Sequence, residues 1–550
     1  MTESERLLGN DGRSNAGFAP GLNLDPAPST FHGFLKRLFT SAVRDQPATL
    51  GADSPEVPVS TPKLFSLVML VTTVRRRLLI VGCLCLCPLL SCSQSEVGAG
   101  GDLTVESEEE LRQEIEAIIN AALPEGENGG PEFLEALEIL GEIIGENRYT
   151  VDFTFLFLPE NALPDYADAA TMTRTRHAFE EAMEQGMMAM IRDAVRRPRL
   201  QMSRLIFGED GFPESHDIRR VASLLTAHAR KAAGDSDFDG MLNSFRDALH
   251  LSRHLERLPI LLWKVTGQAI HIEVLQEFMH LSREHTLPES VLTEMLALVE
   301  PPTTLPDETD ALIAVEAKLL QKLLRPYFDE RGMTVRERRA ELFSQANALR
   351  WQLSLTLQNF DERYPEVPDE PGSRHLRNFS DWDDVRRELE RANETVREWY
   401  ALPFAERRQL TPLDDLDVRL RPMTLEMMIL AYADVLFSYR NTLEITNVRF
   451  AGTQLALAIE LHRHRNGVYP NSLDELVPGE LETLPRDTIN EMNFGYRRTS
   501  NDGGDPDYIL YSAGDNGIDD GGTPCGRFGT AWAGDDPDQP CDYVIPIDRR

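Results

Sequence analysis

A short apolar segment divides this chain of 550 residues into unequal parts. Residues 78–90, a run of thirteen, are almost entirely apolar, and the basic triplet Arg75-Arg76-Arg77 comes directly before them. A helix that spans a bilayer needs about 20 apolar residues, so this run fits the hydrophobic region of an export signal better than a membrane span. An uncleaved membrane anchor is the alternative. Either interpretation places the folded part of the chain after this segment.

The apolar run ends in Leu89-Leu90-Ser91-Cys92. This ending resembles the lipobox of bacterial lipoproteins. The resemblance implies that residues 69–91 are a signal peptide, that cleavage occurs before Cys92, and that the Cys92 thiol carries the lipid. Residues 92–104, rich in Gly and Ser, then form a flexible tether. We expect a membrane-anchored protein of a bacterial cell envelope that faces the periplasm or the cell exterior.

Residues 1–68 precede this signal, although signal peptides are N-terminal. They are rich in Pro, Gly, Ser and Asp and show no sustained periodicity. Met69 lies at the usual distance from the cleavage site. We therefore interpret residues 1–68 as disordered or as the product of a start placed too far upstream. A cytoplasmic tail is the alternative.

The net charge of −34 is concentrated after the signal, because residues 1–91 carry +2 and the remainder carries −36. A surface of that sign repels phosphate backbones, so we expect no nucleic acid partner. It is compatible with cation binding, with a basic partner, or simply with solubility.

Cysteine usage agrees with export. Cys83, Cys85 and Cys87 lie within the signal, which leaves Cys525 and Cys541 in a segment rich in Gly, Pro and Asp. In an oxidising compartment these two should form a disulfide that closes a short loop. A metal site would need further ligands, and no Cys-x-x-Cys pair or later His is present.

Residues 105–440 show mostly helical periodicity and predict a large multi-helix bundle or irregular helical array. Residues 151–158 are an exception, because their aromatic and partly alternating pattern predicts a strand or an extended packed segment. Ser380 is expected to cap the helix that follows it. The predicted helices are 106–123, 131–144, 170–205, 217–234, 237–256, 258–283, 288–299, 307–328, 334–359, 380–399 and 423–465.

Catalytic motifs are absent from this helical region. The sequence contains no Gly-x-Ser-x-Gly, no phosphate-binding Gly-x-x-x-x-Gly-Lys and no dinucleotide-binding glycine pattern. His250 and His254 are four residues apart and could present two imidazoles to a metal ion, but the zinc-protease form His-Glu-x-x-His is missing. A chance pair on a packed helix is the alternative.

The last hundred residues follow a definite order. An amphipathic helix ends at Asn466-Gly467, a good helix C-terminus, and is followed by Val468-Tyr469-Pro470. Ser472 could cap a short helix, and Leu484-Pro485-Arg486-Asp487 comes next. Residues 494–497 and 508–512 should pair as an antiparallel hairpin. Residues 514–522 make an acidic, glycine-rich loop.

This order resembles the periplasmic domain of the major pseudopilins of type II secretion. The resemblance covers residues 446–522 and implies a small α+β domain, here residues 441–550, built from a long helix and an antiparallel hairpin. The processed transmembrane helix of that family is missing. A lipid anchor and more than three hundred residues, mostly helical, take its place.

The same resemblance implies calcium in the glycine-rich loop. The matching residues are Asp515, Asn516, Asp519 and Asp520, and Asn516 stands where the family has an Asp. Hard oxygen ligands suit calcium, although the spacing differs from an EF-hand loop. A plain acidic turn is the alternative.

Two classes of function remain open from the sequence. The first is a non-enzymatic, lipid-anchored envelope protein that binds an unknown protein partner and is linked to a secretion or pilus-like system. The second is a periplasmic hydrolase whose site is assembled from scattered helical residues. Converging carboxylates or histidines in a deep pocket would favour the enzyme.

Overall fold

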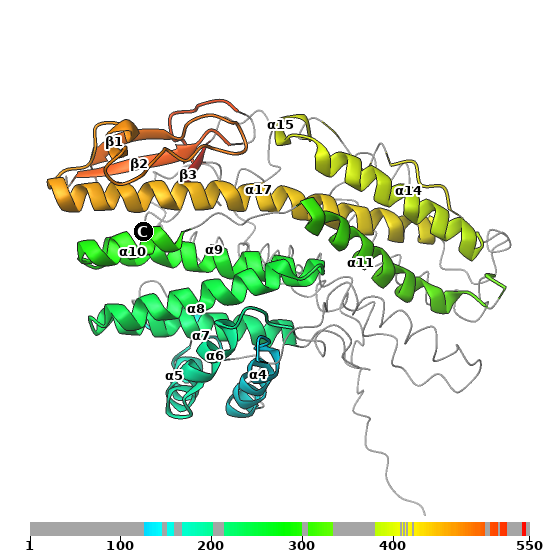
Figure 1. Cartoon of the computed structure of the whole chain (residues 1–550), viewed down its shortest axis with the longest axis horizontal. Helices are drawn as coiled ribbons and strands as arrows, with labels where there is room; N and C mark the ends of the chain where they lie inside the picture. The colour runs from blue at the N-terminus through cyan, green and yellow to red at the C-terminus, as the bar shows by residue number, and fades with distance from the viewer. Residues whose placement is uncertain are drawn as a thin grey trace, which may run out of the picture. The chain divides into compact units, whose positions relative to one another are not determined.

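The computed structural model describes residues 126–145, 151–158, 168–201, 214–299, 306–329, 331–333, 380–407, 410, 413, 416–420, 423–500, 506–514, 517–524 and 542–545. These residues are mainly helical and carry one small antiparallel sheet near the C-terminus (Figure 1). The predicted helical class with a C-terminal sheet is therefore confirmed at this level. Cys92, Asp515, Asn516, Cys525 and Cys541 lie outside the described residues, as do the predicted helices 106–123 and 334–359.

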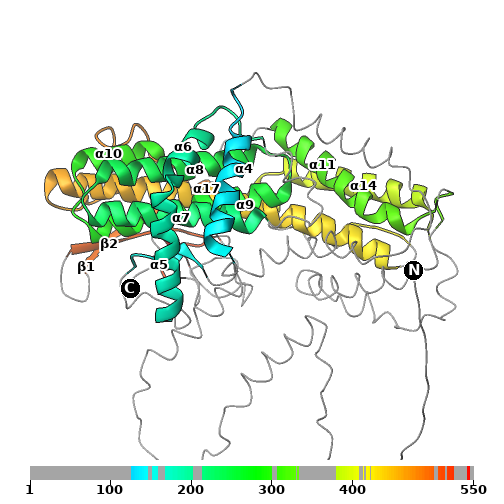
Figure 2. The same ribbon diagram turned by 90° about the horizontal axis from the view of Figure 1, so that it is seen from below.

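The helices between residues 130 and 298 share one hydrophobic core. Figure 2 shows the backbone of these helices from below. Phe133, Phe179, Phe245 and Phe278 are among its fully or almost fully buried side chains. Helices α7, α8 and α9 pack on one another in sequence order, while α4 packs on α6. The elements are α4 (Gly130–Ile144), η3 (Phe153–Phe155), α5 (Ala169–Glu184), α6 (Met187–Val195), α7 (Glu214–Gly234), α8 (Phe238–Arg257), α9 (Leu261–Glu284) and α10 (Glu289–Leu298).

A second core lies between the helices that follow and the first half of the longest helix. Trp399 and Phe437 meet edge to face in this core, with ring centroids 4.8 Å apart. The elements are α11 (Pro306–Leu324), η6 (Arg325–Tyr327), α14 (Trp382–Ala401), α15 (Phe404–Arg407) and α17 (Met423–Asn466). Because α11 packs on α14 and α14 packs on α17, the three helices enclose this core.

Helix α17 connects the helical body to the sheet. It has 44 residues, which corresponds to a length of about 66 Å. Its apolar residues are distributed around the whole circumference, a pattern typical of a helix buried on all sides. Figure 1 shows α9 and α10 along its C-terminal half, with the sheet lying on the same half. The predicted domain boundary at residues 440 and 441 falls inside this unbroken helix.

The sheet consists of three antiparallel strands in the order β1-β2-β3. They are β1 (Gly495–Ser500), β2 (Pro506–Ser512) and β3 (Tyr543–Ile545), and a short 3₁₀ helix, η9 (Leu473–Leu476), precedes them. Gly495 pairs with Tyr511 and Ser500 with Pro506, so the predicted hairpin is confirmed. A third core joins Leu510 and Ile545 of the sheet to Leu455 and Ile459 of α17.

Two local predictions differ from the structure. Residues 153–155 form the 3₁₀ helix η3 and not a strand, because the Asp152 side chain accepts a hydrogen bond from the Thr154 backbone N–H at 3.0 Å. The predicted packed character of this segment is confirmed by the buried Phe153. The predicted helix 170–205 is interrupted at Gly186, whose φ of +73° ends α5 and starts α6.

Two predicted caps also differ. Asp381, not Ser380, caps α14, because Asp381 and Asp384 exchange side-chain to backbone hydrogen bonds in a capping box. Ser472 precedes η9 without a capping hydrogen bond from its side chain. Instead, the Asn471 backbone N–H donates to Glu475 at 3.0 Å. The predicted C-terminus of α17 is confirmed, since Gly467 adopts a φ of +74° and donates to the Arg463 carbonyl at 2.7 Å.

Buried ion pairs hold the helices of the first core in register. The Arg230 guanidinium binds both carboxylate oxygens of Glu277 at 2.6 and 2.7 Å, which joins α7 to α9. The fully buried Asp247 of α8 accepts from Arg192 of α6 at 2.9 Å and from Arg196, just after the end of α6, at 2.8 Å. Bidentate and shared carboxylates of this kind fix side-chain geometry, and loss of one partner would leave a buried charge.

Within the described residues, no helix is long and apolar enough to cross a membrane.

Glu316 of α11 caps a helix that belongs to another part of the body. Helix α9 starts after Ile260, which has no side chain able to cap it. The Glu316 Oε1 atom accepts the Leu261 backbone N–H at 2.6 Å in its place. Burial of the carboxyl raises its pKa to about 7, against the opposing effect of that hydrogen bond. This contact couples α11 to the first turn of α9.

We predict that Glu316 makes stability depend on pH in a defined direction. The folded protein holds the Glu316 proton more tightly than the unfolded chain. The contribution of Glu316 to the free energy of unfolding is therefore complete below pH 4.5 and is lost as pH rises through about 7. Glu316→Gln keeps an acceptor but cannot ionise. The variant should therefore gain on the order of 3 kcal/mol relative to the wild type between pH 5 and pH 8. Urea unfolding at both pH values measures this difference. The exposed Glu398→Gln on α14 is the control, and equal shifts for both variants would contradict the assignment.

Candidate functional site

The candidate site is the sheet with the glycine-rich loop beside it. Its inner face packs on α17 and on the turn after that helix, where three tyrosines meet. The Tyr469 and Tyr508 rings meet edge to face with centroids 5.1 Å apart, and the Tyr496 ring lies 6.0 Å from Tyr508. The Tyr496 hydroxyl donates to the Pro470 carbonyl at 2.8 Å. The Tyr-Pro turn singled out in the sequence is therefore the contact between the helix end and β1.

Charged groups surround these tyrosines. The buried Glu460 of α17 accepts from the Tyr469 hydroxyl at 3.3 Å and lies 3.1 Å from Arg463. Arg283, at the end of α9, places its guanidinium 5.2 Å from the Tyr508 ring centroid and 3.9 Å from the Asp507 carboxylate. Burial raises the pKa of Glu460, while Arg463 and Arg283 oppose that shift. The cluster ties α9, α17 and β2 together.

The segment between η9 and β1 is organised by Asp487. Its carboxylate, 1% exposed, accepts from the Ile489 backbone N–H at 2.9 Å and from the Ser512 hydroxyl at 2.6 Å. Asn490 donates to the same carboxylate at 3.1 Å and to the Gly514 carbonyl at 2.6 Å. Asp487 thus holds the end of β2 and the start of the glycine-rich loop, which gives a physical role to the Leu-Pro-x-Asp segment.

Asp542 holds the other side of the loop. Its carboxylate is fully buried and accepts the backbone N–H groups of Asp520 at 3.2 Å and Gly522 at 2.7 Å. Burial raises the pKa of Asp542, and the two N–H donors oppose that rise. No local sequence pattern marked this residue, because its partners lie about twenty positions earlier in the chain.

The loop packs on the outer face of the sheet. Gly522 has a φ of +76°, and a Cβ atom added there would lie 2.7 Å from Ile509 and 2.9 Å from the Tyr511 ring. Only glycine fits both the backbone conformation and the space. The Tyr511 hydroxyl donates to Asp519 Oδ1 at 2.9 Å, and the Gly521 backbone N–H donates to the same oxygen at 2.9 Å. Helix α17 and this loop therefore cover opposite faces of the sheet.

The structure describes half of the predicted calcium ligands. Asp519 and Asp520 lie in the described part of the loop, whereas Asp515 and Asn516 do not. Asp519 Oδ1 is already taken by two donors, so its Oδ2 is the oxygen left to face a cation. Across the described ranges, no group of three or more His, Cys, Asp or Glu side chains could hold a metal ion. Calcium binding stays a prediction that depends on all four residues.

His250 and His254 do not converge on a common point with a third ligand in the described part of the chain. The buried His254 uses Nε2 to donate to the Val195 carbonyl at 2.9 Å, which links α8 to the end of α6. Burial lowers the pKa of His254 to about 4. A nitrogen committed to a carbonyl is unavailable as a ligand, so the packed alternative is the better description of this pair.

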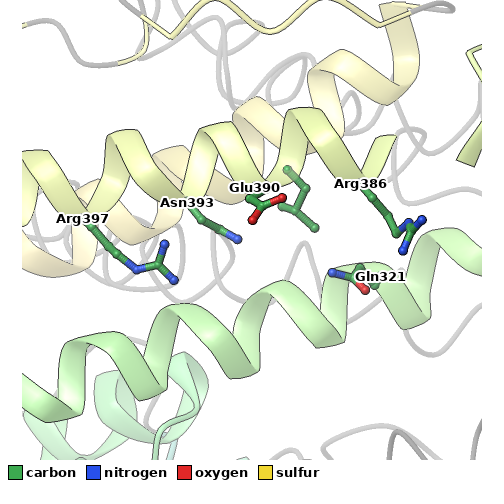
Figure 3. A pocket seen from close by; sticks show the side chains of 6 residues that line it. Gln321, Arg386, Glu390, Asn393 and Arg397 are labelled. Atoms are coloured by element: carbon green, nitrogen blue, oxygen red, sulfur yellow. The ribbon is translucent and has the colours of Figure 1, made fainter. Parts of the chain in front are cut away.

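A separate pocket lies between α11 and α14 (Figure 3). It has a volume of about 360 Å³ and is lined by Gln321, Arg386, Leu389, Glu390, Asn393 and Arg397. The Asn393 Oδ1 atom accepts from the buried Tyr432 hydroxyl at 2.7 Å, which turns the amide nitrogen toward the gap between the helices. Glu390 is the one carboxylate among the described lining residues, and no imidazole joins it. The described lining residues therefore do not include the paired acid and base expected of a hydrolase.

Comparisons with protein-family models, with curated proteins and with solved structures gave no match to this chain.

We predict that His254 makes the protein sensitive to mild acid. Its folded pKa of about 4 lies below the ordinary 6.5, so its contribution is complete above pH 6.5 and is lost as pH falls toward 4. His254→Gln should remove up to about 3 kcal/mol of this pH dependence. Thermal melting at pH 7 and pH 4.5 measures it, with the exposed His177→Gln on α5 as the control. A variant that melts with the wild-type pH dependence would contradict the prediction.

We also predict that millimolar calcium raises the melting temperature by a few degrees, because an ion that binds only the folded state stabilises it. Asp515→Asn and Asp519→Asn should each reduce the shift, since each removes a charged oxygen. Magnesium is the control ion, because it demands a smaller and more regular octahedral site. The absence of any shift with calcium would rule out the loop as a calcium site.

Proposed function

We propose that this chain is a lipid-anchored protein of a bacterial cell envelope whose role is structural or protein-binding. In this proposal Cys92 carries the lipid, and residues 92–104 tether the folded part to the membrane. The signal peptide predicted at residues 69–91 supports the location. A disulfide between Cys525 and Cys541 belongs to the same proposal, because it requires an oxidising compartment.

We further propose that residues 446–522 act as a pseudopilin-like cap that links the protein to a secretion or pilus-like system. The observation that carries this proposal is the continuity of α17. The second half of this helix packs on the sheet, and the first half is part of the core formed with α11 and α14. The helical body would then present the cap, in the place of a transmembrane helix. The burial of Tyr469 between α17 and Tyr508 supports the resemblance at the turn.

The anchor is tested by intact-mass analysis of the protein purified from membranes. We expect a chain that starts at Cys92, carries fatty acids, and is lighter by two hydrogens for a disulfide. Cys92→Ser should remove the fatty acids and leave the signal uncleaved, whereas Cys525→Ser should keep the lipid and lose only the disulfide. An unlipidated chain with residues 1–91 intact would overturn the proposal.

The interaction role is tested by chemical cross-linking in membranes followed by affinity purification. A partner that is captured by the wild type and lost when residues 495–545 are replaced by an unrelated domain would support the cap as the binding element. Recovery of the protein alone, with no stable partner, would count against a scaffold.

A further inference from the structure

Strand β1 is an edge of the sheet. It pairs with β2 from Gly495 to Ser500, and the order β1-β2-β3 leaves its other side as the end of the sheet. In an antiparallel pair, alternate residues direct their N–H and C=O groups away from the partner strand. No backbone group among the described residues bonds to that outer side of β1. Such a row of groups can pair with an added strand.

Two consecutive arginines stand on this edge strand. Arg497 and Arg498 are exposed and, as neighbours in a strand, point to opposite faces. Arg497 donates to the Gly521 carbonyl at 3.1 Å and Arg498 to the Asn471 side-chain oxygen at 3.0 Å. Both acceptors are neutral. Neither guanidinium group forms an ion pair within the described residues, in a chain of net charge −34.

One acidic neighbour lies near Arg498 without pairing with it. Arg498 contributes to the lowered pKa of Glu475, whose main cause is the Asn471 side chain. Both Glu475 oxygens are occupied, since Asn471 donates its backbone N–H at 3.0 Å and its side-chain amide at 2.9 Å. The guanidinium of Arg498 is therefore left without an ion-pair partner among the described residues.

The geometry leaves the edge as the accessible side of β1. Its inner face is occupied by Tyr496, which bonds to Pro470 beside α17. Its outer face is crossed by the loop at Gly521, which Arg497 contacts. A partner that binds β1 must therefore add alongside it, through backbone hydrogen bonds, and not stack on either face.

We infer that β1 takes up an extended acidic segment of a partner protein, which pairs with it as an additional strand. Strand addition supplies affinity through backbone hydrogen bonds, and side chains provide the selectivity. Acidic residues at two consecutive positions of the added strand would meet Arg497 and Arg498 on the two faces. A second copy of this chain is a poor occupant, because pairing of two β1 strands would bring arginines against arginines. The inference deepens the proposed protein-binding role and rests on it for the existence of a partner.

The test uses the full chain in detergent and two synthetic peptides blocked at both ends, Thr-Val-Asp-Glu-Val-Thr and the matched Thr-Val-Lys-Lys-Val-Thr. We expect the acidic peptide to bind and to slow hydrogen exchange at alternate amides of residues 495–500. Arg497→Gln and Arg498→Gln should each weaken binding by up to about fivefold. The double variant Arg497→Glu with Arg498→Glu should bind the lysine peptide more tightly than the acidic peptide. Thermal melting checks that each variant is folded.

Three results would overturn the inference. They are failure of the acidic peptide to bind, binding without protection of β1 amides, and a double variant that keeps the wild-type preference. A dimer in sedimentation whose formation protects the β1 amides from exchange would identify a second copy as the occupant and would also overturn it. None of these results touches lipidation at Cys92 or partner capture from membranes, so this inference and the proposed function can fail separately.

Discussion

Helix α17 is the constraint on which the described structure depends. Its residues enter all three cores: Leu425 to Tyr439 in the core with α14, Phe450 and Leu457 in the core with α9, and Leu455 and Ile459 in the core with the sheet. Most stability of a helix in a protein comes from packing of its sides. A break in α17 would therefore affect the three cores at once. Helix α9 also reaches all three, through Leu261 in the core with α14, Phe278 in the first core and Met279 in the core with the sheet.

Buried polar groups specify how the helices around α17 align. Three contacts join helices that are far apart in the sequence. They are Arg230 with Glu277, Asp247 with Arg192 and Arg196, and Glu316 with the start of α9. Apolar packing tolerates small displacements along a helix axis, but a hydrogen bond of 2.6–2.9 Å does not. These contacts give the body one register, and burial of the Glu316 carboxyl, which raises its pKa, adds a pH dependence at the start of α9.

Much of the helical architecture could be predicted from the sequence because it depends on periodicity. The bounds of α7, α8, α10 and α17 agree with the predicted ranges within a few residues. The hairpin followed from two short apolar segments on either side of a polar turn. Features that depend on distant partners could not be predicted. β3 has only three residues and is defined by its pairing with β2, and Asp542 acts on a loop about twenty residues earlier.

The unbroken passage of α17 from body to sheet has a mechanical consequence. A hinge would require residues that change backbone conformation freely, and from Met423 to Asn466 the helix instead runs on without interruption. Tension applied at the sheet would be carried along the helix axis through its hydrogen bonds and would reach the packing around α14 nearly undiminished. The sheet and the helical body are therefore mechanically coupled through α17, so that a force on the sheet also acts on the core around α14.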